Sequence, residues 1–181
     1  MSTYAPNEAW LVVKTKPRAE KKIDEQLTNA GYESFLPIST VVRQWSDRKK
    51  KVEVPLISGV VFVKNNLTNV NELYNFPQVN SILKEFNQPA LVSPQEIDNL
   101  KILIKEWNGE LIECKESISY CSGDEVEVVR GDFAGIIGEL IATNGKHRLV
   151  VQLKSLNVEF TVNIPKIACE TNKVQASSLG F

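Results

Sequence analysis

The chain has 181 residues and an ordinary hydrophobic content, enough for one medium domain or two small ones with a buried core. Its 21 basic and 22 acidic residues nearly cancel, so no overall field favours nucleic acid or a charged partner. No apolar run approaches the roughly 18 residues that span a bilayer, and the opening residues lack the basic and apolar blocks of a signal peptide. We therefore expect a cytoplasmic protein with no membrane partner.

Composition and motifs also argue against metal binding and catalysis. Three cysteines without a CxxC pair and a single histidine fit neither a disulfide framework nor a typical zinc site. The sequence contains no GxSxG elbow, no P-loop and no HExxH motif. We expect no metal, no cofactor and no enzymatic activity, and we expect a monomer.

The chain opens with a strand and a helix. An apolar run at residues 10–13 predicts the first strand, and apolar residues at helical spacing predict a helix over 17–30. Pro17 suits a first helical turn, because its missing N–H would have no partner there. Residues 32–40 then predict a second strand, which Pro37 places at a sheet edge or bends.

Residues 41–51 are locally basic, with five basic residues and one acid around Trp45. We expect an exposed hairpin arm or loop here. Basic side chains that grip phosphates, beside an indole that stacks on an unpaired base, form a combination used to hold single strands. A run of charges is more often a solvated loop with no partner. The sequence leaves both interpretations open.

Residues 54–65 are the most apolar continuous segment of the chain. Their β-branched and aromatic side chains predict a buried central strand. Side chains alternate across a strand, and both sets of alternate positions are largely apolar here. If helices cover one face of the sheet, the other face needs a second layer or a partner.

Three weaker elements and one strong helix follow. Residues 68–76 predict a short helix, and 79–83 with 89–92 predict one more strand or an irregular pair. Ser93 then suits a helix N-cap, with proline at the first helical position and Glu96 at the third. This capping signature predicts a helix that ends at an Asn-Gly stop.

The last third of the chain predicts strands only. Residues 110–120 lack periodicity and read as a linker, whereas 126–167 contain short β-rich runs separated by glycine and asparagine. This spacing favours a small antiparallel barrel of about five strands, with a hairpin turn at Asn144-Gly145. We therefore expect an α+β chain: an αβ sandwich with an antiparallel sheet and about three helices, followed by a small all-β barrel. The expected boundaries are 1–8 for a flexible N-terminus, 9–108 for the first domain, 109–121 for the linker, 122–170 for the barrel and 171–181 for a flexible tail.

The start of the barrel carries the sharpest local motif. Val128 lies in an alternating strand, Gly131 supplies a turn that needs positive φ, and Gly135 and Gly138 allow close backbone approach. With Phe133 between the glycines, the segment resembles the KOW motif of NusG-type transcription factors and of several ribosomal proteins. Two interpretations of Phe133 stay open, a core ring of the barrel or a partly exposed contact for a partner.

The first half of the chain resembles the NusG amino-terminal domain. Trp10-Leu-Val-Val, followed by Lys14-Thr15-Lys16-Pro17, is similar to that family's opening pattern, and Pro55-Leu-Ile-Ser-Gly-Val-Val-Phe-Val is similar to its central strand. Together the two halves of the resemblance cover about residues 9–170.

The resemblance implies a domain that docks on the clamp helices of RNA polymerase, joined by a linker to an SH3-like KOW barrel. It also implies proximity to non-template DNA or nascent RNA, and a ribosomal protein or termination factor as partner of the barrel. The residues expected to contact polymerase are Trp10, Leu56, Ile57, Gly59, Val60 and Phe62. Those expected to contact nucleic acid are Lys14, Lys16, Arg18, Arg43, Trp45, Arg48, Lys49, Lys50 and Lys51. The KOW and partner-binding residues are Val128, Gly131, Phe133, Gly135 and Gly138. For the polymerase set, simple packing under the 68–76 helix is the alternative.

Two positions depart from the family's pattern. Ser58 stands where proline is usual, and Val60 stands where tyrosine is usual, so an aromatic anchor for the interface is absent. These departures and a compact KOW turn favour a specialised paralogue, similar to the RfaH and UpxY antiterminators of long operons, often for surface polysaccharides. We therefore expect a transcription elongation factor that promotes processive elongation or antitermination. The alternatives are a housekeeping NusG factor and an RNA- or ribosome-binding module with no polymerase role.

Overall fold

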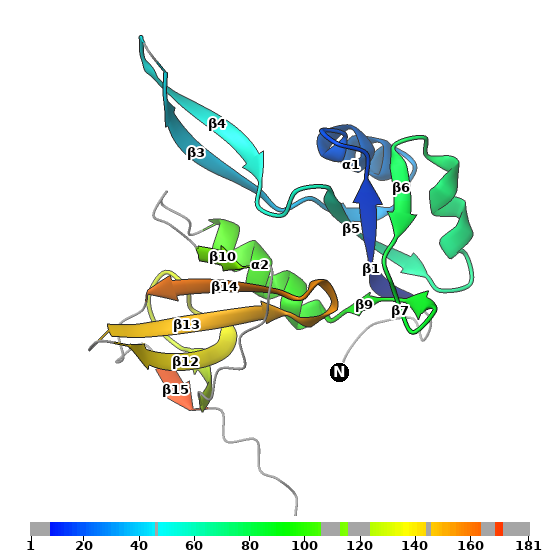
Figure 1. Cartoon of the computed structure of the whole chain (residues 1–181). Helices are drawn as coiled ribbons and strands as arrows, with labels where there is room; N and C mark the ends of the chain where they lie inside the picture. Colours follow the sequence, from blue (N-terminus) through cyan, green and yellow to red (C-terminus); the bar gives the residue numbers. More distant parts are fainter. Residues whose placement is uncertain are drawn as a thin grey trace, which may run out of the picture. The chain divides into compact units, whose positions relative to one another are not determined.

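The computed structural model describes residues 8–45, 47–105, 113–115, 124–143, 146–163 and 169–171. The chain divides into two compact units, Met1–Gly109 and Glu110–Phe181 (Figure 1). Antiparallel strands form the sheets of both units, and the two α-helices of the described residues belong to the first. The mixed α+β class that the sequence predicts is therefore confirmed. No helix in these ranges is long and apolar enough to cross a membrane.

The sheet of the first unit is built around two central strands. β1 (Glu8–Thr15) pairs antiparallel with β5 (Val60–Asn66), which places Val12 opposite Phe62. Both strands are rich in β-branched residues, which pack well on a pleated surface. The remaining strands of this sheet are β2 (Glu33–Phe35) beside β5, and β6 (Val79–Ile82) and β9 (Leu91–Val92) beside β1.

One face of this sheet packs against α1 (Glu20–Asn29) and the 3₁₀ helix η1 (Val70–Asn75), and forms the core of the unit. Ile23 and Leu27 stand four residues apart, so both point from the same side of α1 into the sheet. Burying one such side chain contributes about 1.5–3 kcal/mol. The fully buried members of this core are Leu11, Val13, Ile23, Leu27, Val61, Val63 and Leu73.

The other face of the sheet is also apolar, as the sequence predicts. Because residues opposite each other in the ladder share a face, Trp10, Val12 and Phe62 lie together on it, and all three are buried. Phe35 of β2 stacks on Phe62 with 6.1 Å between ring centroids. Lys101 of α2 (Pro94–Lys105) places its ammonium 5.7 Å from the Trp10 ring centroid and 5.8 Å from that of Phe35. Lys101 thus joins the helix to this aromatic cluster through cation–π contacts.

The N-terminus of α2 has the predicted reciprocal cap. The backbone N–H of Ser93 donates to Glu96 Oε2 at 2.8 Å, and the backbone N–H of Glu96 donates to Ser93 Oγ at 3.2 Å. Two amide groups that helix geometry leaves without partners are satisfied in this way. The capping signature read from the sequence is confirmed.

The apolar segment 54–65 is not the single strand that the sequence predicted. Its first two residues end β4 (Lys49–Pro55), residues 56–59 turn, and β5 begins only at Val60. Gly59 has a φ of 71°, a left-handed conformation that interrupts an extended chain and favours glycine. Because the segment is apolar throughout, its sequence does not predict this turn.

The strand predicted over 32–40 is divided. β2 ends at Phe35 and β3 (Ile38–Gln44) begins after Pro37. Proline has no N–H to give to a ladder, so the chain leaves the first sheet at this point. β3 then pairs with β4 in a separate two-stranded sheet.

The helix predicted over 17–30 begins three residues later than expected. Arg18 has a φ of 60°, and the N–H of Ala19 donates to the carbonyl of Lys16 at 3.1 Å, which makes a turn before the helix. Pro17 lies in this turn and not in the first turn of α1.

The region predicted as a short helix and one more strand is more divided than expected. The helix is the 3₁₀ helix η1, which is shorter than the predicted 68–76. The chain over 79–92 forms four short strands, of which β6 and β9 join the first sheet. Between them, β7 (Lys84–Glu85) and β8 (Gln88–Pro89) pair only with each other in the described structure.

The second unit contains a six-stranded antiparallel sheet within the described residues, with the order β10-β14-β13-β12-β11-β15. Its interior includes Leu149, Val151 and Phe160, all fully buried. An all-β unit of this kind is consistent with the predicted KOW domain. Its strands are β10 (Glu113–Lys115), β11 (Asp124–Val128), β12 (Ile137–Thr143), β13 (Lys146–Leu153), β14 (Val158–Asn163) and β15 (Cys169–Thr171), with a 3₁₀ turn η2 (Lys154–Leu156) between β13 and β14.

One of these strands lies where a linker was expected. β10 falls within 109–121 and pairs with β14, so that part of the predicted linker belongs to the second sheet. The predicted turn at Asn144-Gly145 lies outside the described residues. So do the predicted flexible ends, except for Glu8 in β1 and Thr171 in β15.

Candidate nucleic-acid interface

The basic segment of the sequence forms a hairpin that projects from the first sheet (Figure 1). β3 and β4 pair through seven residue pairs, from Ile38 opposite Pro55 at the root to Gln44 opposite Lys49 at the tip. At the tip, the N–H of Trp45 donates to the carbonyl of Arg48 at 2.8 Å. The exposed hairpin arm predicted for residues 41–51 is confirmed.

The root of the hairpin is tied to α1 by an ion pair. Lys21 Nζ donates to Glu53 Oε2 at 2.7 Å, and both side chains are more than half exposed. The hydrogen bond and the charge of Lys21 hold the pKa of Glu53 below its ordinary value. Water screens a pair as exposed as this one, so its contribution to stability is small.

The described basic side chains of the arm are solvent-exposed, and so is its aromatic ring. Trp45 is 51% exposed, and Lys50 Nζ lies 5.6 Å from the centroid of its ring. Arg48 Nε is 3.7 Å from the carboxylate of Asp47, next to it in the chain. Arg43 pairs with Lys50 through the backbone, and its side chain lies outside the described part of the structure. The exposed cations of the described arm are Arg48, Lys49, Lys50 and Lys51.

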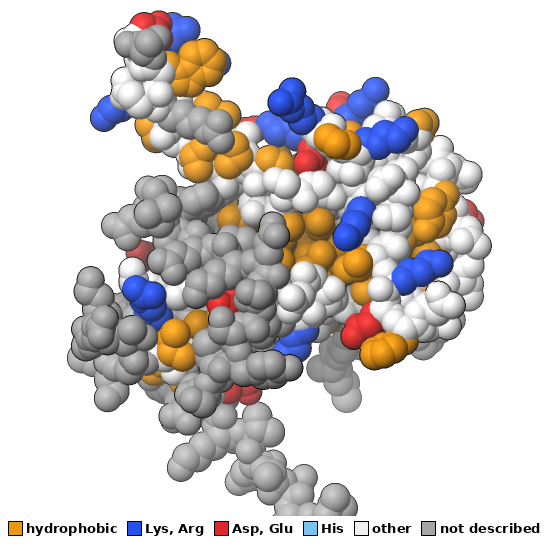
Figure 2. All heavy atoms as spheres, viewed as in Figure 1, with side chains coloured by type: hydrophobic (Ala, Val, Ile, Leu, Met, Phe, Trp, Pro, Cys, Tyr) orange, Lys and Arg blue, Asp and Glu red, His pale blue; other side chains and the backbone are white. Residues whose placement is uncertain are grey.

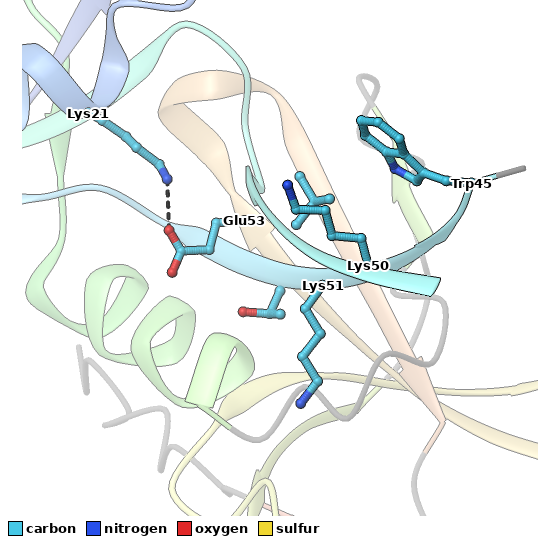
Figure 3. A pocket seen from close by; sticks show the side chains of 7 residues that line it. Lys21, Trp45, Lys50, Lys51 and Glu53 are labelled. Carbon is cyan, nitrogen blue, oxygen red and sulfur yellow. Dashed lines mark hydrogen bonds and ion pairs between the residues drawn. The ribbon is translucent and has the colours of Figure 1, made fainter. Parts of the chain in front are cut away.

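An open cavity of about 560 Å³ lies along the arm and reaches α1 (Figure 3). In Figure 3 the Lys21–Glu53 pair stands at one end of this cavity and Trp45 at the other. Its volume is within the range of small-ligand sites, and three of its side chains carry ammonium groups. The lining residues are Lys21, Thr40, Trp45, Lys50, Lys51, Val52 and Glu53.

The other predicted nucleic-acid residues lie near the end of β1 and in the turn before α1. Lys14, Lys16 and Arg18 are exposed, and none of the three lines the cavity. Figure 2 shows blue basic side chains both on the arm and near α1. The structure therefore brings one α1 residue, Lys21, to the arm and leaves these three in a separate basic group.

The six residues expected to contact polymerase fall into two groups. Trp10, Val60 and Phe62 are buried strand residues. Leu56, Ile57 and Gly59 lie half-buried in the turn before β5. A partner can therefore contact the turn residues, whereas the strand side chains are inaccessible unless the sheet is disrupted. The sequence could not separate the groups, because it assigned all of 54–65 to one strand.

The turn before β5 is fixed by a contact that sequence analysis missed. Glu20, only 8% exposed, accepts the N–H of Gly59 at 2.8 Å through Oε1. The carbonyl of Gly59 accepts the N–H of Thr15 at 2.9 Å. At the other end, the N–H of Leu56 donates to the carbonyl of Pro37 at 2.7 Å. Hydrogen bonds from three distant segments thus hold the turn.

The KOW residues extend from the last residue of β11, through the connection, into β12. The N–H of Val128 donates to the carbonyl of Ile136 at 2.9 Å, and the N–H of Gly135 donates to the carbonyl of Val128 at 2.7 Å. Gly131 lies exposed in the turn with a positive φ, as predicted. Phe133 is half-buried. Its ring is therefore neither a fully buried core residue of the barrel nor a fully exposed contact for a partner.

Gly138 occupies a position where strands approach closely. A Cβ built on it would lie 2.5 Å from the carbonyl oxygen of Val150 on β13, closer than real Cβ contacts. Only glycine therefore fits here without moving β12 or β13.

One exposed aromatic residue gave no signal in the sequence. Phe86 and Asn87 form the two-residue turn between β7 and β8, with φ values of 47° and 67°, and the Phe86 ring is 95% exposed. Such turns usually carry asparagine or glycine at both positions. Because phenylalanine is unusual at this position, the sequence does not predict the hairpin. Among the described residues, no group of three or more His, Cys, Asp or Glu side chains is placed to hold a metal ion.

Comparison with known proteins places these features in context. A family model described as "Transcription termination factor nusG" matches residues 8–101, more than half of the chain. A solved structure described as "Domain interaction in Thermotoga maritima NusG" is 20% identical, covers 92% of this chain and 98% of its own, and has a TM-score of 0.46. Two crystal structures of the MjSpt4:Spt5 complex are 18% and 16% identical, each covering 90% of this chain and 96% of its own, with a TM-score of 0.31. No curated protein matches the chain.

Proposed function

The chain belongs to the NusG family, whose members are non-enzymatic transcription elongation factors that bind RNA polymerase, and on this premise we propose that it promotes processive elongation or antitermination in the cytoplasm. It does so as a monomer docked on the polymerase clamp helices. The factor stabilises the elongation-competent polymerase over the paused one, because it binds the first state more tightly.

The turn at 56–59 supplies the proposed polymerase contact. Leu56 and Ile57 are half-buried, so each has apolar surface left for a partner. The backbone on both sides of them is held by hydrogen bonds from Pro37, Glu20 and Thr15. A contact that is rigid before binding loses little conformational entropy on docking. This preorganised apolar turn is the observation that carries the proposal. Trp10, Val60 and Phe62 support it from within the sheet.

The basic arm supplies a second contact, with non-template DNA or nascent RNA. Its exposed cations attract phosphates, and the exposed ring of Trp45 offers a stacking surface for an unpaired base. We assign Lys14, Lys16 and Arg18 to the same role, because they are exposed and basic in the same unit.

The second unit recruits a further partner, a ribosomal protein or a termination factor, through the connection between β11 and β12. Phe133 is half-buried there, and Val129 of the same connection is exposed. A specialised role in long operons, such as those for surface polysaccharides, is supported by Ser58 and Val60, which depart from the family's usual residues. A buried valine at position 60 leaves polymerase binding to the turn and to the arm.

Polymerase retention and transcript length test the docking proposal. Tagged full-length protein is mixed with purified RNA polymerase, and elongation is followed on templates with and without the native leader of the gene. Ile57→Asp should abolish both retention and the effect on elongation, because it puts a charge into the apolar turn. Leu67→Asp is the matched control, since Leu67 is an exposed apolar residue in the same unit, and it should behave like wild type. Wild-type protein that fails to retain polymerase, or an Ile57→Asp variant that keeps it, would contradict the proposal. Retention of ribosomes without polymerase would favour the RNA- or ribosome-binding alternative.

The specialised role has a separate test in the genome. A second NusG-family gene should exist beside genes for translation and secretion, as expected if this chain is a paralogue. Finding this gene as the only copy would rule the specialised role out and leave the housekeeping one.

A further inference from the structure

We propose that the cavity between the arm and α1 is a phosphate subsite for single-stranded nucleic acid, in which a backbone phosphate replaces Glu53 as the partner of Lys21. This inference rests on the proposed contact between the arm and nucleic acid. It adds a defined place for one phosphate and a residue, Glu53, that opposes binding until it is displaced.

The geometry of the cavity supports a place for one nucleotide unit. Three ammonium groups line the cavity, Lys21 at its α1 end and Lys50 and Lys51 on β4, and Lys50 is the one that lies near the ring of Trp45 (Figure 3). A base stacked on Trp45 therefore has its own backbone, or that of its neighbour, beside ammonium groups. Aromatic stacking next to a cationic track is the arrangement that binds single strands without reading their sequence.

Lys21 differs from the other two cations of the cavity because a carboxylate holds it. Its Nζ donates to Glu53 Oε2 at 2.7 Å, across 32 positions of sequence. Glu53 comes from the arm and Lys21 from α1, so this contact both ties the arm down and neutralises one cation of the subsite.

The exchange of partners requires little free energy. Lys21 and Glu53 have side-chain exposures of 56% and 60%, and ion pairs in water are weak because both groups remain solvated. A phosphate offers several anionic oxygens to the same ammonium group, and charge-assisted hydrogen bonds to it are strong. Once released, the Glu53 carboxylate turns into solvent. It then repels the incoming strand less than it would beside Lys21.

Two measurable consequences follow from the exchange. Removing the Glu53 charge should tighten binding by up to about fivefold, the upper end of what exposed ion pairs contribute. Removing Lys21 should delete about one phosphate contact, so the dependence of log K on log salt should become shallower by about 0.7 for a single strand in Lys21→Gln.

The test uses the full chain and labelled oligonucleotides of one sequence, prepared as single-stranded DNA, single-stranded RNA and duplex DNA. Binding is measured by fluorescence anisotropy over a series of salt concentrations. Five variants are compared with wild type: Glu53→Gln, Lys21→Gln, Asp47→Asn, and the two double variants that combine Lys21→Gln with Glu53→Gln or with Asp47→Asn. Asp47→Asn is the matched control because it removes one carboxylate from the same arm, next to Arg48 at the tip. The DNA and RNA arms identify which single strand supplies the phosphate.

The expected result is a gain from Glu53→Gln that disappears when Lys21 is also replaced. Asp47→Asn releases Arg48 and not Lys21, so any gain it gives should persist in the Lys21→Gln background. A Glu53→Gln gain of equal size with and without Lys21, or no gain at all, would overturn the exchange and leave the arm's role in binding intact. Tighter binding of the duplex than of both single strands would overturn the single-strand assignment. If neither wild type nor any variant binds an oligonucleotide, the inference and the arm's nucleic-acid contact fail together, while polymerase docking stands or falls on the Ile57→Asp test.

Discussion

The carboxylate of Glu20 accepts the backbone N–H of Gly59 at 2.8 Å, across 39 positions of sequence. Glu20 is the first residue of α1 and Gly59 is the last residue before β5. The bond therefore couples the start of the helix to the turn that presents Leu56 and Ile57. A buried hydrogen bond to a charged group contributes about 1.5–3 kcal/mol.

Glu20→Ala should lower the free energy of unfolding of the first unit by about 1–3 kcal/mol, because the N–H of Gly59 loses its acceptor in a partly buried position. Glu20→Gln keeps an oxygen acceptor and should lose less. Urea denaturation measures both. Glu25→Ala, at an exposed position of the same helix, should stay within about 0.5 kcal/mol of wild type. Equal losses at positions 20 and 25 would show that the bond to Gly59 is not the cause.

Gly59→Ala should cost about 1–2 kcal/mol, the penalty for a left-handed conformation in a residue with a Cβ. The space around it is sufficient, since the nearest atom to a built Cβ is the Thr15 carbonyl oxygen at 3.9 Å, so the loss comes from the backbone. The same urea series detects it. Ser58→Ala, next to it and exposed, is the control. A wild-type denaturation curve for Gly59→Ala would mean that the turn does not keep its positive φ.

Ser93→Ala should destabilise α2 by about 1 kcal/mol, because the N–H of Glu96 loses the Ser93 hydroxyl that accepts it. Hydrogen exchange should accelerate in the first turn of α2 and stay unchanged in β1. Ser93→Thr retains a hydroxyl acceptor and should restore most of the protection. Equal exchange rates in Ser93→Ala and wild type would argue that water replaces the cap without loss.

Tyr32 should make the first unit less stable at alkaline pH. Burial first, and then the hydrogen bond to Glu72 and its charge, raise the pKa of Tyr32 above its ordinary value of 10.0. The folded state therefore holds the phenol proton more tightly than the unfolded chain does. The stabilising effect is complete below pH 10 and disappears as pH rises through the raised pKa.

Urea denaturation of wild type and Tyr32→Phe between pH 8 and pH 11 checks this linkage. The alkaline loss of stability should be smaller in Tyr32→Phe, which has no proton to release. Glu72→Gln keeps the phenol and removes the charge, and should give an intermediate loss. Parallel pH profiles for wild type and Tyr32→Phe would exclude Tyr32 as the titrating group.

Gly138→Ala should cost about 3 kcal/mol in the second unit, because its methyl group would press on the backbone of β13 at Val150. Hydrogen exchange of the β12 and β13 amides resolves this effect within the full chain, where the two units need not unfold together. Gly131→Ala meets no atom within 4 Å, so steric overlap should not contribute to its effect. Protection of β12 unchanged by Gly138→Ala would mean that the strands separate at little cost.

The features that the sequence predicted correctly depend on residues close together in the chain. The cap of α2 needs only Ser93 and Glu96, and the arm is recognisable because five basic residues surround Trp45 without an apolar face to bury. Such local preferences act over one turn of helix or one hairpin. They remain valid whatever the rest of the chain does.

The features that were missed depend on residues far apart. The turn before β5 looks like strand because its residues are apolar, and only Glu20 and Thr15, from other elements, reveal why the chain turns at Gly59. Likewise, nothing near Glu53 in the sequence indicates that Lys21 is its partner. The late start of α1 results from the positive φ of Arg18, which its residue type does not favour.

The arm is joined to the rest of its unit through few contacts, and this bears on how the protein diversifies. The buried core of the first unit contains no residue of the projecting part of β3 and β4. Substitutions at positions 40–53 therefore leave the folding free energy nearly unchanged while they alter charge and shape at the tip. Substitutions that adapt the segment to a new target can accumulate there without loss of folding stability. The sequences of related chains should therefore diverge fastest in this segment and slowest at the Glu20–Gly59 contact.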